Sequence, residues 1–148
     1  MYSLDDLDVT KRCEIPFEFE YLDDTTGKGT GIFLTIIGSH AQVIADFTAK
    51  ELNERRVAEA MNAKRDPRGK NPVVIKIEDD VEFSTELIAL RIVGWRGIKE
   101  PFSHENAVKL CHKNAPMKEQ ILAKSDDMKN FPMPFSTSSP ASSDTAPT

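Results

Sequence analysis

The stretch that decides the fold runs from residue 87 to residue 131 and reads LIALRIVGWRGIKEPFSHENAVKLCHKNAPMKEQILAKSDDMKNF. An apolar run leads to the dipeptide Gly94-Trp95, which holds the only tryptophan of the chain. Ser103 has the side chain of a good helix N-cap, and Pro116 suits the first turn of a further helix. The stretch has no pattern of a nucleophile, a metal cage or a phosphate cradle, so we interpret it as a packing and docking element.

This stretch and the residues before it predict helices within 80–131. An apolar helix is expected over about 80–93, with Gly94 at its C-terminal end and Trp95 in the following turn. A second helix is expected to run from the Ser103 cap to about residue 113, and a third from Pro116 to about residue 130.

The N-terminal half predicts a β-hairpin followed by a helix. Residues 15–22 alternate apolar and acidic side chains, residues 23–30 are rich in turn formers, and residues 31–37 are apolar and β-branched. The hairpin is therefore expected over 14–37. Ser39 is the expected N-cap of a helix over 40–63, which the loop 64–72 follows.

Residues 73–77 are ambiguous, because the β-branched run Val73–Ile77 favours a strand, whereas Asn71 and Pro72 are equally suited to start a helix. Residues 1–13 are predicted to be a flexible N-terminal arm, and residues 132–148 a disordered tail rich in Ser, Thr and Pro. The expected fold class is α+β, in which an N-terminal antiparallel hairpin packs on a helical body of about four helices (14–131).

The composition of the 148 residues is that of a soluble globular protein, with 39% hydrophobic and 29% charged residues. The net charge of −5 argues against nucleic acid as a partner, because nonspecific binding needs a basic face. No apolar run reaches the roughly 18 residues of a membrane span, and the acidic N-terminus is unlike a secretory signal. The expectation is a cytoplasmic protein with no membrane partner and with Cys13 and Cys111 as free thiols.

No residue pattern predicts an enzyme, a cofactor or a metal site. The glycine-rich stretch 27–31 lies between two strands, whereas a phosphate-binding loop joins a strand to a helix. His104, Cys111 and His112 lie near one another in the sequence, but no second pair supplies further metal ligands. The paired acids of the chain occur at ends and turns, where solvation and helix capping explain them.

Large apolar side chains are the candidates for protein interaction. Next to turns, such groups are either parts of a small core or anchors for a partner, and the sequence leaves both open. The candidates for interaction with another protein are Val43, Ile44, Phe47, Trp95, Phe102 and Phe131.

The order of short motifs along the chain resembles the tail assembly chaperones of long-tailed, siphovirus-type bacteriophages. In that family a W-x-G turn is followed by P-F-S-x-E-N-A, one more helix and a closing N-F. Here the corresponding stretches are VGWRG (93–97), PFSHENA (101–107) and Asn130-Phe131. The resemblance covers roughly 14–131, and the loop 98–100 is shorter than the acidic turn that relatives often carry.

The resemblance implies a non-enzymatic assembly factor in the cytoplasm of the infected host cell. Such a chaperone binds the tape measure protein, helps to recruit tail tube protein, and is absent from the mature virion. Association of the protein with a second copy of itself is also left open. Two alternatives are a structural virion component of the tail or connector, and a small enzyme or nucleic-acid regulator.

Overall fold

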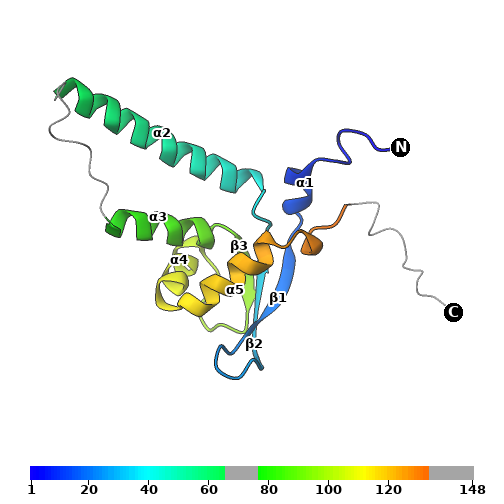
Figure 1. The fold of residues 1–148 in the computed structure, drawn as a ribbon. Coiled ribbons are helices and arrows are strands. Elements are labelled where there is room, and N and C mark those ends of the chain that lie inside the picture. The colour runs from blue at the N-terminus through cyan, green and yellow to red at the C-terminus, as the bar shows by residue number, and fades with distance from the viewer. Residues whose placement is uncertain (66–76, 134–148) are drawn as a thin grey trace.

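A three-stranded antiparallel sheet carries helices on one face, with strands in the order β1–β2–β3 (Figure 1). The computed structural model describes residues 1–65 and 77–133. Strands β1 (Phe17–Leu22) and β2 (Gly29–Ile36) form the hairpin that the sequence predicts, with Phe17 opposite Ile36 and Leu22 opposite Gly29. The predicted α+β class, an N-terminal hairpin packed with helices, is confirmed.

The helices follow the predicted order with some changes at their ends. Ser103 is the expected N-cap, since its Oγ accepts a hydrogen bond from the backbone N–H of Asn106 at 3.0 Å. The helix expected over 116–130 instead ends at Asp126, and a 3₁₀ turn follows it. The helical elements are α1 (Val9–Cys13), α2 (Gln42–Arg65), α3 (Ile77–Ala89), α4 (His104–Lys113), α5 (Ala115–Asp126) and η1 (Met128–Asn130).

The prediction of one helix over 80–93 is wrong at its C-terminal end. Helix α3 ends at Ala89, and strand β3 (Ile92–Arg96) follows and pairs with β2. Gly94 and Trp95 are therefore strand residues, where the sequence predicts a helix end and a turn. The reason is tertiary, because the second edge of β2 offers backbone hydrogen-bonding groups that β3 satisfies.

A bulge interrupts β3, so its residues do not show the alternation of apolar and polar side chains that identifies a strand in the sequence. The register shifts between Thr35 and Ile36 of β2, so that Gly94 lies opposite Thr35 and Ile92 opposite Ile36. Val93 is the extra residue, and it is exposed. Ile92 and Trp95 both pack against the core as a result, with a spacing that imitates a helix.

Ser39 does not cap α2, which is a second correction. Its hydroxyl instead donates to a carboxylate oxygen of Asp126 and accepts from Nη2 of Arg91 at 3.3 Å. Arg91 is buried, and it also donates to Leu87 O at 2.7 Å and to Ser125 Oγ at 3.1 Å. One guanidinium thus joins the segment after β2, the end of α3 and the end of α5.

The N-terminal segment 1–13, predicted to be a flexible arm, contains the short helix α1. Asp8 caps it by accepting from the backbone N–H of Lys11 at 3.2 Å. Cys13 at its end is fully buried, and Nε of Arg12 donates to Phe131 O at 3.0 Å. The last residues of the segment therefore belong to the packed body.

Two clusters of buried side chains form the core. The larger lies between the sheet and helices α3, α4 and α5, and the smaller joins α1, the start of α2 and the end of the described chain. The larger consists of Phe19, Tyr21, Leu34, Ile36, Ala89, Ile92, Ala107, Cys111, Met117 and Ile121, and the smaller of Cys13, Ile37, Ala41, Ile44 and Phe131.

Three predictions fall outside the described residues for most of their length. They are the loop 64–72, the strand or helix over 73–77, and the disordered tail over 132–148. Of the ambiguous segment, only Ile77 is described, as the first residue of α3.

Candidate protein-interaction surfaces

A surface pocket lies where the end of β3 meets α4, and we name it the Trp95 groove. Its volume is about 380 Å³, within the usual size of a site for a small ligand or a few side chains. It is lined by Trp95, Ile98, Glu100, Asn106, Lys109, Leu110 and Lys113.

Hydrogen bonds hold the wall of the Trp95 groove in place. The indole Nε1 of Trp95 donates to Glu100 O at 3.0 Å, and Asn106 Nδ2 donates to Pro101 O at 2.9 Å. The ring of Phe102 meets the Trp95 ring edge-on, with 5.2 Å between centroids and 90° between planes. The half-buried indole therefore packs on the core on one side and lines the groove on the other.

The groove combines an apolar lining with lysines. Trp95, Ile98 and Leu110 supply the apolar surface. Lys109 is exposed and forms a loose ion pair with Glu105 at 3.7 Å, while Lys113 forms no ion pair with any described residue. Exposed pairs of this kind contribute little stability, so both ammonium groups remain available to an anionic partner.

The second surface is on α2, which extends away from the sheet beside α3 (Figure 1). One aromatic stack joins the two helices, between Phe47 and Phe83, with centroids 5.4 Å apart and planes 11° apart. The guanidinium of Arg55 lies 5.6 Å from the centroid of the Phe83 ring, which adds a cation–π contact.

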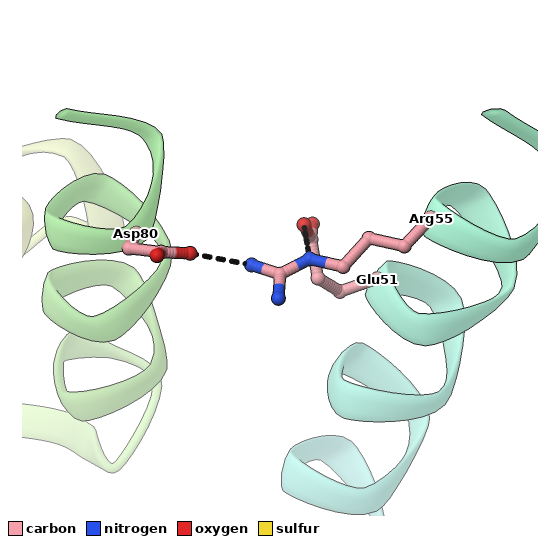
Figure 2. Close-up of polar contacts among 3 residues, drawn as sticks. All are labelled: Glu51, Arg55 and Asp80. Carbon is pink, nitrogen blue, oxygen red and sulfur yellow. Dashed lines mark hydrogen bonds and ion pairs between the residues drawn. The ribbon is translucent and has the colours of Figure 1, made fainter. Parts of the chain in front are cut away.

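Arg55 also forms the polar clasp between the helices that Figure 2 shows. Its Nε donates to Glu51 at 3.1 Å on its own helix, and its Nη2 donates to Asp80 of α3 at 2.8 Å. The hydrogen bond that Arg55 donates to Glu51 is the largest cause that raises the pKa of Arg55 above its ordinary value. The bond that it donates to Asp80 adds to this shift, and desolvation opposes it. The clasp is partly exposed, so it orients α2 more than it stabilises the fold.

Helix α2 exposes several apolar side chains to solvent. Val57 and Met61 are about one helical turn apart and lie on the same face of the helix as Val43. Leu52 lies about two and a half turns after Val43, so it is on the opposite face. The helix therefore exposes apolar groups on both sides of its contact with α3. The exposed fractions are between 43% and 51% for Val43, Leu52, Val57 and Met61.

The six predicted interaction residues fall into three pairs. Ile44 and Phe131 are only 6% and 1% exposed, so both are core residues in this structure, and the Phe131 ring packs edge-on against Phe17. On α2, Val43 is exposed, and Phe47 is half-buried against Phe83 of α3. Trp95 and Phe102 lie together, on a surface separate from α2.

Sequence reasoning missed the α4 side of the Trp95 groove. Asn106, Lys109, Leu110 and Lys113 recur at the spacing of one helix face, so a helical projection of 104–113 would have grouped them. Ile98 carried no such signal, because only the turn after β3 brings it beside α4.

The part of the chain that the structure describes shows neither a metal site nor a membrane-spanning helix. Within 1–65 and 77–133, no three His, Cys, Asp or Glu side chains are placed to hold a metal ion. In the same residues, no helix has the length and apolar character needed to cross a membrane. Comparisons of the chain with protein-family models, with curated proteins and with solved structures found no match.

Proposed function

We propose that this protein is a tail assembly chaperone of a long-tailed bacteriophage, which binds the tape measure protein and helps to recruit tail tube protein. One observation carries the proposal. The two motifs of the family resemblance, VGWRG and PFSHENA, contact each other through the Trp95–Phe102 ring pair. Two motifs that follow the order of the family and also contact each other support the proposal more strongly than the sequence match alone.

The exposed apolar side chains of α2 support the same function. A chaperone for a long helical client needs apolar surface that the client covers, with charges around it that keep the free chaperone in solution. Val57 and Met61 are flanked in sequence by charged residues, including Arg56 and Glu59. We propose that apolar helices of the tape measure protein bind along this part of α2.

Co-expression tests the proposal directly. The tape measure protein of the same phage is produced alone and with the tagged chain, and its soluble fraction is measured. We expect a several-fold gain in soluble tape measure protein and its co-purification with the tag. No gain together with no co-purification would overturn the proposal.

A matched pair of variants locates the client surface. Val57→Ser with Met61→Ser removes exposed apolar groups and is expected to abolish the gain in solubility. The control, Ala49→Ser with Ala58→Ser, changes exposed α2 positions that carry little apolar surface. Both variants should keep the fold, because exposed substitutions cost little stability.

The proposal also places the protein in the host cytoplasm and outside the mature particle. Mass spectrometry of purified virions distinguishes it from a structural tail or connector subunit. We expect the tape measure and tail tube proteins in the particles and only traces of this chain. A stoichiometric amount would favour the structural component instead.

A further inference from the structure

The first eight residues, MYSLDDLD, form an ordered and exposed arm before α1. The backbone N–H of Ser3 donates to Asp6 Oδ2 at 3.0 Å, and the N–H of Asp6 donates to Ser3 Oγ at 3.2 Å. This reciprocal pair is the capping arrangement that starts a helical turn, and Leu7 N donates to Leu4 O at 3.2 Å within it. Leu4 and Leu7 therefore lie on one side of the turn, 89% and 51% exposed.

The arm and the Trp95 groove are complementary in chemistry. The arm presents two leucines among Asp5, Asp6 and Asp8. The groove presents an aromatic and aliphatic lining beside Lys109 and Lys113. Apolar side chains that enter such a pocket leave neighbouring carboxylates close to the ammonium groups, which favours association and sets its orientation.

We propose that the arm of one copy binds in the Trp95 groove of a second copy, so that the protein self-associates through its N-terminus. Leu4 and Leu7 enter the groove, and the acids of the arm lie beside Lys109 and Lys113. This inference does not depend on the proposed chaperone function, whose client surface is on α2.

The topology favours a second copy over the same chain. The arm precedes α1, which is anchored beside β1 by buried Cys13 and by the bond from Arg12 to Phe131. The groove lies at β3, on the opposite edge of the sheet. In the structure the arm stays away from its own groove, with Leu4 almost fully in water.

Mass measurements over a concentration series test the proposal, using light scattering or sedimentation of the full chain. We expect the average mass of the unchanged protein to rise with concentration. Leu4→Ser with Leu7→Ser disables the arm, and Lys109→Glu with Lys113→Glu disables the groove. Each pair should weaken association by about tenfold or more.

The control is Lys124→Glu with Lys129→Glu, which makes the same charge change at exposed positions outside the groove. It should associate like the unchanged protein. An equimolar mixture of the arm variant and the groove variant retains one intact arm and one intact groove, so we expect it to recover association that neither variant shows alone.

Trp95 supplies a second readout, because it is the only tryptophan and it lines the groove. Adding the peptide MYSLDDLD to the full chain should shift the tryptophan emission, and the groove variant should not respond. Three outcomes would overturn the proposal. The first is a monomer at every concentration, and the second is association that neither variant weakens. The third is an arm variant whose tryptophan emission differs from that of the unchanged protein while its average mass does not. That result would place the arm in the groove of its own chain.

Discussion

The thiol of Cys111 is buried in the larger core cluster, where burial raises its pKa to about 11 despite the opposing charge of Lys118. It remains a neutral thiol at physiological pH and packs as a small apolar group. Cys13 is equally buried, with its sulfur 3.9 Å from that of Met128, and both cysteines are free, as the sequence predicts. At these positions cysteine contributes volume to the core.

Thr85 of α3 is a different case, because it is fully buried and its hydroxyl makes no hydrogen bond to any described residue. Thr85→Val replaces the hydroxyl with a methyl group of similar size. We expect it to raise the free energy of unfolding by about 1 kcal/mol, since a buried polar group without a partner is destabilising. Urea denaturation followed by circular dichroism measures the change.

Thr85→Ser is the matched control for this prediction. It keeps the hydroxyl and removes the methyl group, so it should destabilise the protein. A valine variant that is less stable than the unchanged protein would show that the hydroxyl has a partner in solution.

At the scale of elements, helices α2 and α3 meet through few of the side chains that the structure describes. The Phe47–Phe83 stack and the Arg55 clasp are the contacts that join the two helices. The start of α2 is fixed more firmly, because Ala41 and Ile44 belong to the smaller core cluster. We infer that α2 is held from its start to Arg55, which leaves its later turns, with Val57 and Met61, as the surface that a partner reaches.

The β1–β2 hairpin has a turn that depends on a charged carboxylate. Asp23 accepts from Thr25 Oγ1 at 2.6 Å, from Thr25 N at 2.8 Å and from Thr26 N at 3.2 Å. The Thr25 hydroxyl is the largest of the causes that lower the pKa of Asp23 below its ordinary value of 3.8. These bonds stabilise the charged form and so the turn that contains it.

This lowered pKa predicts the direction of a pH effect. The unfolded chain binds a proton at Asp23 more readily than the folded chain does. Asp23 therefore contributes to the free energy of unfolding above its ordinary pKa, and this contribution is lost as pH falls through the pKa of Asp23 in the folded chain. We expect Asp23→Asn, whose side-chain oxygen still accepts the turn bonds, to lose less stability on acidification than the unchanged protein does. Denaturation midpoints from neutral pH to about pH 3 measure this difference.

Asp24→Asn is the control, because it removes the same charge from the exposed neighbouring residue. It should leave the contribution of Asp23 to the acid dependence in place. The assignment fails if Asp24→Asn flattens the acid dependence as much as Asp23→Asn does.

At the scale of the whole molecule, Arg91 connects parts of the chain that are far apart in sequence. Its guanidinium bonds to Ser39, Leu87 and Ser125, and Ser125 Oγ donates in turn to Ile37 O at 2.8 Å. Burial lowers the pKa of Arg91, and the nearby charge of Asp126 opposes that shift. The network therefore depends on a planar group with several donors in a confined space.

Arg91→Lys keeps the charge and loses this geometry. We expect it to lower the free energy of unfolding by about 2–4 kcal/mol, since the buried partners would lose their donors. Arg96→Lys is the matched control, because Arg96 is exposed and pairs with Glu18 on the open face of the sheet. Its cost should stay below about 1 kcal/mol, and equal losses in the two variants would contradict the role given to Arg91.

The sequence by itself determined the elements whose signals are local. The alternation in 15–22 and the apolar run after the turn predict the hairpin, because one sheet face is buried and the side chains of a strand alternate between faces. Ser103 predicts the start of α4, because its hydroxyl satisfies a backbone N–H within the same turn. These interactions join residues that are close in sequence, so they can be recognised without the fold.

Only the tertiary structure decided β3, the Trp95 groove and the division between core and surface. Ile92 to Arg96 becomes a strand because β2 presents a free edge, and the bulge at Val93 turns both Ile92 and Trp95 toward the core. Phe131 is buried and Phe102 is partly exposed, although both are phenylalanines beside turns. Their environments depend on residues far away in sequence, since burial is set by what the folded chain brings next to a side chain.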